Sequence, residues 1–372
     1  MQLTISQNQL LEQIQSVIGA VERKQIHPIL GHLYLQARNH YFSITASNME
    51  IELISRQPQE AIEEGEITVP ARKLFDICKA LPNDALLSLK VDDKQRLLIR
   101  SGHSRFNLLT LPAEDFPSLN EIPVIQHLQL LEKDLHRLLS KTAFAMASQD
   151  VRYYLNGLLL ETEKNRLRAV ATDGHRLALS EIPLQNESEN SDQPVRVILP
   201  RKGVLELTRL LNANSDSELL LDLCDNHLRA NINNVSFSSK LIDGRYPDHR
   251  GVFPSTKGKQ LEANRLQLKD VLTRATVLLS EDKFKGIELK LSKDSLQVEA
   301  KNKEKESSKD IIDVVYDDKS LDIAFNVQYL IEAINHCEGE KVIMDIRDET
   351  SSTLLIDPSD DDTRFIVMPI RL

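Results

Sequence analysis

The sequence predicts an α+β chain of three tandem domains, each with two helices packed on antiparallel sheets. The first observation behind this class is a repeated segment, which reads PARKLFDIC from Pro70, PRKGVLEL from Pro200 and, more faintly, NVQYLIEAI from Asn326. Successive copies lie about 130 residues apart, which is the size of a domain and longer than a solenoid repeat. The second observation is that strand-type and helix-type periodicities follow the same order around each copy.

The first repeat divides into two similar halves, each with a strand, a helix and three further strands. Leu10, Ile14 and Val17 recur at helical spacing, so a helix is expected at 8–20, after a strand at 2–6. Alternating apolar residues predict the next three strands around 33–37, 42–46 and 51–53. The second half repeats this order at 66–69, 71–80, 86–91, 96–101 and 104–111. Pro70 suits the start of the second helix, where its missing N–H is not needed.

The second and third repeats follow the same plan. Their helices are expected at about 131–147, 201–212, 265–279 and 326–337, and strands of the second repeat around 158–160, 167–171 and 177–179. These elements predict domains at 1–122, 127–253 and 259–372, with linkers at 117–123 and 254–259. The polar stretches 186–194 and 301–309 are interpreted as exposed loops, and the acidic run 360–362 as a solvated turn.

The composition is that of an ordinary globular protein. No run of about 18 apolar residues is present, and the first residues lack the basic and apolar regions of a signal peptide. Cys78, Cys224 and Cys337 are far apart and odd in number, which favours buried, reduced thiols over disulfides or a zinc site. We therefore expect a cytoplasmic protein without a metal or cofactor.

Catalytic motifs are scarce. The sequence has no phosphate-binding GxxxxGK[ST] loop, no HExxH and no GxSxG. One cluster, Asp173 with His175, could serve in acid–base chemistry, but no suitably spaced nucleophile accompanies it. A tight turn between two strands at Asp173-Gly174 is the favoured interpretation. A hydrolase or transferase that uses His175 and Asp173 is the alternative function from another class.

Positive charge is concentrated on the predicted helices. The chain carries a net charge of −10, but the six helical segments together carry +5, which leaves −15 for the rest. Such a distribution would attract a polyanion to the helices and repel it elsewhere. The contributing cations are Arg72, Lys73, Lys79, Lys133, Arg137, Lys141, Arg201, Lys202, Arg209, Arg265, Lys269 and Arg274. A purely structural repeat protein that binds no DNA remains the third interpretation, because helices favour Lys and Arg in any case.

Seven segments in order along the whole chain give a family resemblance. They start at Pro28 (PILG), Val69 (VPARK), Asp150 (DVRYYLNG), Ala171 (ATDGHRL), Pro200 (PRKG), Asp243 (DGRYPD) and Met368 (MPIRL). In these segments the chain resembles the bacterial β sliding clamps, the processivity subunits of DNA polymerase III.

The resemblance implies the DNA clamp fold and a non-catalytic role in DNA replication. Two chains would form a head-to-tail homodimer, a ring of six domains whose twelve helices line a pore around duplex DNA. Contacts to phosphate alone would hold DNA without reading its sequence. The implied partners are the replicative polymerase subunit, an external clamp loader, and other polymerases or repair proteins that bind through short peptides. Such a tether acts by raising the effective concentration of the polymerase.

The resemblance also implies three sets of site residues. The partner-peptide cleft would contain Leu155, Thr172, Gly174, His175, Arg176, Leu177, Pro247, Val252, Asn326, Tyr329, Ser352, Val367, Met368, Pro369 and Arg371. The DNA-facing set would contain Lys24, Arg72, Lys73, Lys79, Arg137, Lys141, Gln149, Tyr153, Tyr154, Arg201 and Lys202. The dimer interface would bring Phe106 and Leu108 against Leu278 and Leu279 of the other chain. Tyr153 and Tyr154 could stack on single-stranded DNA or belong to the core.

The chain departs from the family pattern at three of these positions. Gly251 stands where a second arginine is often found, which removes a polar wall of the cleft. Ile370 replaces a common methionine or valine, and Lys24 replaces arginine, which keeps the charge but not the paired phosphate contact. These changes concern the preference among peptides rather than the function.

Overall fold

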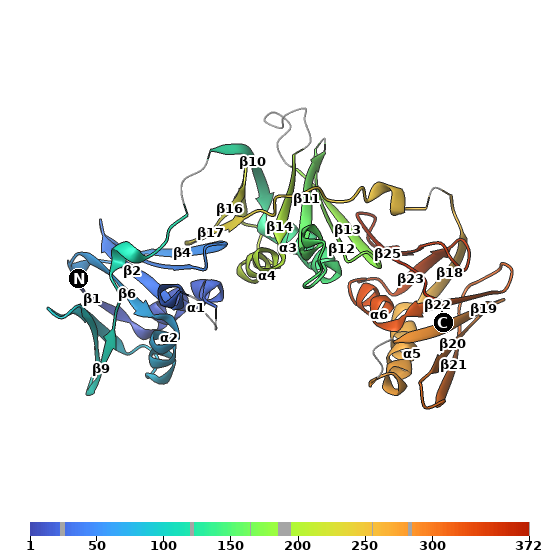
Figure 1. Cartoon of the computed structure of the whole chain (residues 1–372), viewed down its shortest axis with the longest axis horizontal. Coiled ribbons are helices and arrows are strands. Elements are labelled where there is room, and N and C mark those ends of the chain that lie inside the picture. Colours follow the sequence, from blue (N-terminus) through green and yellow to red (C-terminus); the bar gives the residue numbers. More distant parts are fainter. Residues whose placement is uncertain are drawn as a thin grey trace. The chain divides into compact units, whose positions relative to one another are not determined.

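The computed structural model describes residues 1–22, 27–119, 123–163, 165–184, 195–254, 256–281 and 285–371. By internal contacts these residues form two compact units, Met1–Lys133 with Leu205–Leu241, and Asp134–Val204 with Ile242–Leu372. The α-helices of the described residues are α1 (Gln7–Val17), α2 (Ala71–Ala80), α3 (Glu132–Thr142), α4 (Arg201–Leu210), α5 (Arg265–Leu278) and α6 (Val327–Asn335) (Figure 1). They correspond to the six helices expected from the sequence.

The first unit contains two antiparallel sheets. The smaller has the order β5 (Ala61–Glu63), β1 (Gln2–Ser6), β7 (Leu86–Val91), β8 (Arg96–Ser101), β9 (Ser104–Leu109). The larger has the order β10 (Val124–Leu131), β15 (Glu218–Cys224), β16 (His227–Ile232), β17 (Val235–Lys240), β4 (Ile51–Pro58), β3 (Tyr41–Ser47), β2 (His32–Arg38), β6 (Gly65–Pro70).

The second unit is built in the same way. Its larger sheet has the order β14 (Arg196–Pro200), β11 (Gly157–Glu163), β12 (Arg166–Thr172), β13 (Arg176–Pro183), β25 (Thr363–Val367), β24 (Thr353–Ile356), β23 (Lys341–Ile346), β18 (Lys259–Asn264). Its smaller sheet has the order β21 (Ser307–Asp313), β20 (Ser295–Lys301), β19 (Gly286–Ser292), β22 (Leu321–Asn326).

Each larger sheet joins strands from two successive repeats. In the first unit β17 of the second repeat pairs with β4 of the first, with Phe237 opposite Leu53. In the second unit β25 of the third repeat pairs with β13 of the second, with Leu177 opposite Ile366. This pairing explains why the two compact units do not coincide with the three repeats. Strands β10 and β15–β17 of the second repeat share a sheet with the first repeat, and β11–β14 share one with the third.

Local sequence accounts for the helices that cover these sheets. Ser6 begins α1 with a capping box, in which its hydroxyl accepts from the Gln9 backbone N–H and the Gln9 side chain accepts from the Ser6 backbone N–H. The apolar stripe of α1, with Leu10 and Ile14, is fully buried. In α2, Leu74 and Cys78 face the core, while the basic residues of the same helix are exposed.

Two sequence expectations about loops need comment. Residues 301–309 were expected as an exposed loop, but β20 continues to Lys301 and β21 begins at Ser307, so only the turn between them is irregular. The expectation therefore holds for the turn, where the charged residues 303–306 are exposed, and is wrong for the two ends of the range, which pair as neighbouring strands. The other expected loop, 186–194, lies outside the described residues. The short strand β5 was not anticipated, since three residues give too little pattern.

The three cysteines are buried and free, as the sequence predicted. Burial raises the pKa of the Cys78 and Cys337 thiols to about 12, so both remain protonated at neutral pH. Among the described residues, no helix is long and apolar enough to cross a membrane.

The Asp357 carboxylate holds together the chain segments that follow α6. It is 2% exposed and accepts hydrogen bonds from the backbone N–H groups of Glu338, Gly339 and Ser359 and from the Ser359 hydroxyl, at 2.6 to 3.0 Å. Burial by itself raises the pKa of this carboxyl, but these donors outweigh it and lower the pKa to about 2.

We expect the Asp357→Asn substitution to lower the free energy of unfolding in a pH-dependent way. A carboxyl whose folded pKa is depressed stabilises the fold above its unfolded pKa, near 4, and loses this contribution as the pH falls through the folded pKa. The deficit of the variant should be about 2 kcal/mol at pH 7 and about half of that at pH 3. Urea unfolding followed by circular dichroism measures it, with Asp361→Asn, at an exposed position, as the control. A deficit that does not change with pH would contradict this account.

Candidate functional site

A cavity of about 190 Å³ opens in the second unit beside the seam between β13 and β25. Its floor belongs to a buried apolar cluster that includes Leu155, Leu177 and Ile366. The full lining is Arg152, Leu155, Thr172, Gly174, Arg176, Leu177, Pro247, Asp248, His249, Val252, Ile366 and Met368. We call this cavity the apolar cleft. An apolar floor with a few polar groups at the rim suits an extended peptide with hydrophobic anchors.

The turn between β12 and β13 forms one wall of the apolar cleft. The Asp173 carboxylate accepts hydrogen bonds from the backbone N–H groups of His175 and Arg176, at 2.9 and 3.1 Å. Gly174 has a φ of +89°, and a Cβ there would lie 3.0 Å from a guanidinium nitrogen of Arg152, so a larger residue would be strained and crowded. The expected tight turn is therefore confirmed. In it, Asp173 serves the backbone rather than orienting His175.

Arg176 ties this turn to the third repeat. Its guanidinium donates hydrogen bonds to the Phe144 carbonyl oxygen at 2.8 Å and to Asp173 at 3.0 Å, and it forms an ion pair with Glu332 of α6. The same group lies over the Tyr329 ring, 4.7 Å from the ring centroid. The side chain is only 11% exposed, so we assign Arg176 mainly to holding the cleft in shape.

The cleft residues expected from the sequence divide into two groups. Eight of them line the cavity: Leu155, Thr172, Gly174, Arg176, Leu177, Pro247, Val252 and Met368. The remaining seven, His175, Asn326, Tyr329, Ser352, Val367, Pro369 and Arg371, are not part of its lining.

Some residues of the second group still contact the cleft walls. The His175 ring stacks with that of Tyr329, with centroids 6.4 Å apart, and the His175 carbonyl accepts a hydrogen bond from Met368. The Ser352 hydroxyl donates to the Val252 carbonyl oxygen at 3.1 Å. Asn326 caps α6 instead, and accepts from the backbone of Gln328.

Four lining residues were missed from the sequence: Arg152, Asp248, His249 and Ile366. Arg152 and Asp248 lie inside two of the segments that carry the family resemblance, so their position was a usable signal. Ile366 could not have been found in this way, since it reaches the cleft only through the pairing of β25 with β13.

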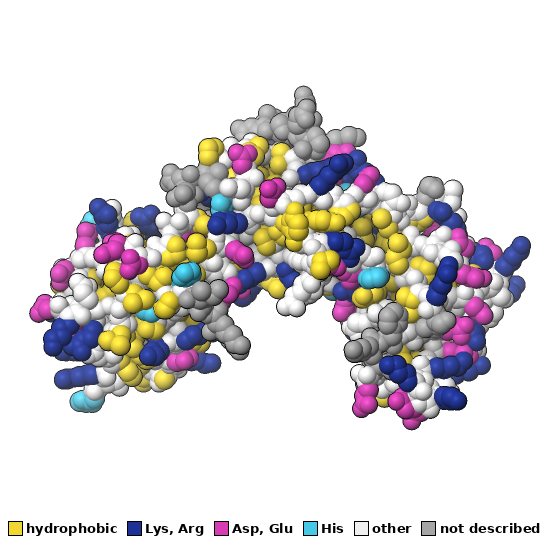
Figure 2. All heavy atoms as spheres, viewed as in Figure 1, with side chains coloured by type: hydrophobic (Ala, Val, Ile, Leu, Met, Phe, Trp, Pro, Cys, Tyr) yellow, Lys and Arg dark blue, Asp and Glu magenta, His cyan; other side chains and the backbone are white. Residues whose placement is uncertain are grey.

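The DNA-facing set is also heterogeneous. Arg72, Lys73 and Lys79 on α2 are exposed, and so is Gln149, whereas Lys24 lies outside the described residues. Tyr153 is 56% exposed, while Tyr154 packs against the apolar cluster, so the two tyrosines have different environments. On the faces drawn in Figure 2, acidic and basic side chains are interspersed in each unit.

Lys141 does not fit the expectation that it faces DNA. Its side chain is 6% exposed, and its ammonium group donates to the His336 carbonyl oxygen at 2.6 Å and forms an ion pair with Glu338 at 2.7 Å. Nearby, Arg137 forms an ion pair with Asp360 at 2.5 Å. The expected solvated turn holds for Asp361 and Asp362 but is wrong for Asp360, which is 8% exposed. Arg201 donates to the Met146 carbonyl oxygen, which leaves part of its guanidinium available.

Two of the four expected interface residues point into their own unit. Leu108 on β9 is 7% exposed and Leu279 after α5 is 1% exposed, so neither side chain is available to a second chain. The exposed apolar residues at these places are Leu109, at 74%, and Val277, at 70%. Phe106 and Leu278 are partly exposed. The expectation is therefore wrong for Leu108 and Leu279, and for Phe106 and Leu278 it stays a prediction.

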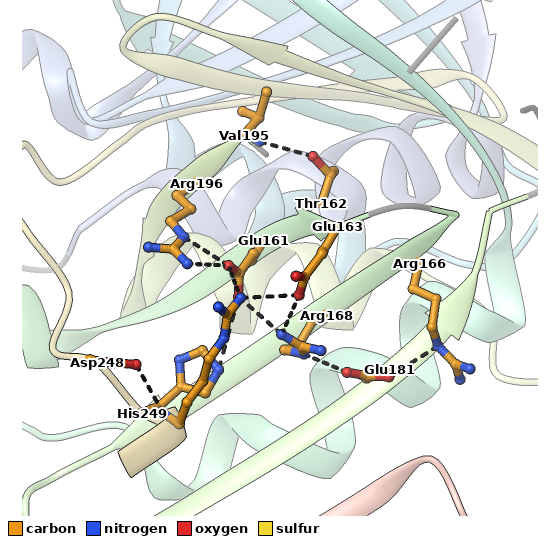
Figure 3. A network of polar contacts seen from close by, with 11 residues as sticks. Glu161, Thr162, Glu163, Arg166, Arg168, Glu181, Val195, Arg196, Asp248 and His249 are labelled. Carbon is orange, nitrogen blue, oxygen red and sulfur yellow. Dashed lines mark hydrogen bonds and ion pairs between the residues drawn. The ribbon is translucent and has the colours of Figure 1, made fainter. Parts of the chain in front are cut away.

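A network of ion pairs surrounds Glu161 in the second unit (Figure 3). Glu161 on β11 is fully buried. Its carboxylate forms ion pairs with the guanidinium groups of Arg196 at 2.5 Å, Arg250 at 3.2 Å and Arg168 at 3.3 Å. Burial by itself raises the pKa of Glu161, but the hydrogen bond from Arg196 and the surrounding positive charges together keep the pKa below its ordinary value. Glu161 therefore stays ionised and fixes several arginines around one buried carboxylate.

Comparisons with known proteins agree over the entire chain. Family models of the DNA polymerase III beta subunit match its N-terminal domain at residues 1–120, its central domain at 129–248 and its C-terminal domain at 250–371. Curated relatives named Beta sliding clamp include that of Pseudomonas putida, 45% identical, and that of Escherichia coli K12, 41% identical, each with both chains covered in full.

Solved structures give the same result. The DNA polymerase III subunit beta from Pseudomonas aeruginosa is 43% identical with a TM-score of 0.95, and each chain is covered in full. A sliding clamp from Bartonella birtlesii bound to griselimycin is 30% identical, again with a TM-score of 0.95 and full coverage of both chains.

We expect Tyr246→Phe to weaken the wall of the apolar cleft. The buried Tyr246 hydroxyl accepts a hydrogen bond from the Thr172 backbone N–H at 3.0 Å, and phenylalanine would leave that donor without its partner. The free energy of unfolding should fall by about 1 kcal/mol. Urea unfolding measures this, with Tyr41→Phe as the control, because Tyr41 is exposed and contacts Arg56 through its ring face. Equal losses in both variants would refute the assignment.

Proposed function

Because the chain belongs to the DNA polymerase III beta subunit family, the sliding clamps, we propose that it encircles duplex DNA as a head-to-tail homodimer and tethers the polymerase through the apolar cleft. The family is one of DNA clamps that act as non-catalytic processivity factors. We place this activity in the cytoplasm, where reduced thiols such as its three free cysteines persist. The proposed domains are residues 1–122, 127–253 and 259–372.

The main support for a ring-shaped dimer is the regular way in which the edge strands of successive repeats pair. The last strand of the first half of repeat one, β4, pairs with the last strand of repeat two, β17. In the same way β13 of repeat two pairs with β25 of repeat three. By this rule β21 of repeat three should pair with β9 of repeat one. Both are edge strands of their sheets among the described residues, which leaves them for a second chain.

The side chains around these edges support such an interface. Leu109 at the end of β9 and Ile311 on β21 are large apolar residues that are 74% and 57% exposed. Arg105 on β9 is exposed, and so is Asp313 on β21, which gives one pair of opposite charges across the two edges. Asp310 on β21 is already paired with Arg274 of the same chain. Pairing of β21 of each copy with β9 of the other would close the ring, because each copy supplies one edge of each kind.

The exposed cations of α2 support binding to duplex DNA. Arg72, Lys73 and Lys79 present positive charge on an otherwise acidic chain. Contacts from such side chains to phosphate are independent of base sequence, as a clamp that slides requires. Binding of single-stranded DNA through the exposed Tyr153 ring is a further part of this proposal.

The apolar cleft supports tethering by short peptides, and the remaining alternatives lack such support. We propose that the polymerase subunit, the clamp loader and repair proteins share this cleft. The hydrolase hypothesis loses its geometric basis, because Asp173 is engaged by the backbone of the turn and by Arg176. A structural protein that binds no DNA would be unaffected by the charge changes described below.

The clamp should be retained on circular DNA and lost from linear DNA, because its hold is topological. We expect retention on a nicked circle, after loading with a bacterial clamp loader and ATP, to disappear when the circle is cut, as followed by gel filtration. Arg72→Glu with Lys73→Glu should reduce retention several-fold, while Lys293→Glu with Lys303→Glu serves as a charge-matched control. Equal retention on both forms of DNA would sink the proposal.

The protein should be a dimer that depends on the exposed edge of β21. We expect Ile311→Lys to weaken dimerisation about ten-fold, since it places a charge at an apolar contact. Sedimentation across a dilution series measures the dissociation constant, and Met49→Lys, at an exposed turn position, is the control. A monomer at all concentrations, or an equal effect of both variants, would rule out this interface.

A further inference from the structure

A second cavity adjoins the apolar cleft in the second unit. It has a volume of about 360 Å³ and shares Pro247, Asp248 and His249 with the apolar cleft. Its apolar part, Leu159 and Ile198, belongs to the same buried cluster that forms the floor of the apolar cleft. The two cavities are therefore neighbouring parts of one continuous surface.

The second cavity differs from the first in its charge. Arg196, Arg245 and Arg250 line it, against a single lining carboxylate, that of Asp248. We call it the basic pocket. The side chains of Arg196 and Arg250 are 55% and 51% exposed, so their guanidinium groups reach the surface.

Buried carboxylates hold two of these arginines in place. Arg196 donates to Glu161 through Nε at 2.7 Å and Nη2 at 2.5 Å, and Arg250 donates through Nη2 to Glu161 and Glu163 (Figure 3). A guanidinium has five N–H donors, so both side chains keep donors beyond these contacts. Because the arginines are already ordered, an anion that binds them loses little affinity to side-chain ordering.

His249 separates the basic pocket from the apolar cleft and lines both. The residue is 5% exposed, and its Nε2 atom has no hydrogen-bond partner among the described residues. Burial lowers the pKa of His249, so the imidazole is neutral at neutral pH. The Nε2 atom lies 3.9 Å from the Glu161 carboxylate, so His249 is a buried part of the wall between the two cavities rather than a contact for the ligand.

We propose that the basic pocket binds the carboxylate of an acidic side chain that flanks the hydrophobic anchors of a peptide held in the apolar cleft. This inference rests on the proposed peptide-binding function of that cleft. The carboxylate would accept hydrogen bonds from Arg245 and from the free donors of Arg196 and Arg250.

The observations favour a peptide over a nucleic acid as the ligand. The two cavities share three lining residues, and both are floored by one apolar cluster, so an extended chain anchored in the apolar cleft passes directly to the basic pocket. A phosphodiester strand has no hydrophobic anchor for that floor.

The test uses three synthetic ten-residue peptides with a central Leu-Leu pair and an amidated C-terminus. One carries Gln pairs on both sides of the leucines, the second a Glu pair on the N-terminal side, and the third a Glu pair on the C-terminal side. Dissociation constants for the full-length protein are measured by isothermal titration calorimetry. We expect one acidic peptide to bind about five-fold more tightly than the neutral peptide, which is typical of a partly exposed ion pair.

Arg245→Gln should abolish this five-fold gain and leave the neutral peptide unaffected, because Arg245 is exposed and the ion pairs of Glu161 are made by other residues. Lys257→Gln, which removes one exposed charge elsewhere in the same unit, should preserve the gain. Equal affinities for all three peptides, or a gain that survives in Arg245→Gln, would overturn the inference.

Two further results distinguish a carboxylate site in the basic pocket from a failure of the apolar cleft and from a DNA site. If no peptide binds at all, both the proposed function of the apolar cleft and the inference about the basic pocket are wrong. If the three peptides bind tightly and equally, only the inference about the basic pocket is wrong. A ten-nucleotide oligothymidine is titrated in parallel. If Arg245→Gln weakens the oligonucleotide and leaves the acidic gain intact, the pocket is a DNA site and the inference is wrong.

Discussion

Pairing between the edge strands of successive repeats is the interaction on which the rest of this structure depends. An exposed sheet edge presents unpaired N–H and C=O groups that readily accept another strand. Here β4 pairs with β17 and β13 with β25, so each pairing turns two small sheets into one larger sheet. Backbone hydrogen bonds make such a junction nearly independent of side chains. One mode of contact can therefore recur along repeats whose sequences have diverged.

The same pairing creates the apolar cleft. The cleft combines the turn after β12 with the end of β25, segments that are distant in sequence and meet only because Leu177 lies opposite Ile366. The corresponding junction in the first unit has a different character. There a larger cavity is lined by polar residues such as Arg56 and Asp222, and by Glu52, whose carboxylate accepts a hydrogen bond from the Leu119 backbone. One architecture thus gives an apolar seam in one unit and a polar seam in the other.

Local patterns in the sequence predicted the elements better than they predicted which face of an element is exposed. The helix at 71–80 was placed at its observed bounds, because Pro70 and the spacing of Leu74 and Cys78 are local signals. The face of β9 was misjudged, since Leu108 and Leu109 are both leucines and only the neighbouring strand decides which one is buried. Likewise no local signal reveals that Lys141 meets Glu338, which is nearly 200 residues away along the chain. The periodicity of the sequence cannot predict contacts that form only when repeats pair with one another.

The burial of Lys141 changes how the charge distribution of the chain is understood. From the sequence, the net charge of the six helical segments is positive, which suggests that the helices form a positively charged surface. In the structure some of them are engaged within the protein, as Lys141 is with Glu338 and Arg209 is with Glu206. Cations of this kind stabilise the fold and contribute little field at the surface, whereas the exposed cations of α2 remain available. A protein that must hold duplex DNA and still slide along it needs only moderate attraction, because each additional phosphate contact strengthens binding. Partial internal neutralisation is therefore compatible with the proposed function, in which closure of the ring, rather than tight contact with phosphate, retains the DNA.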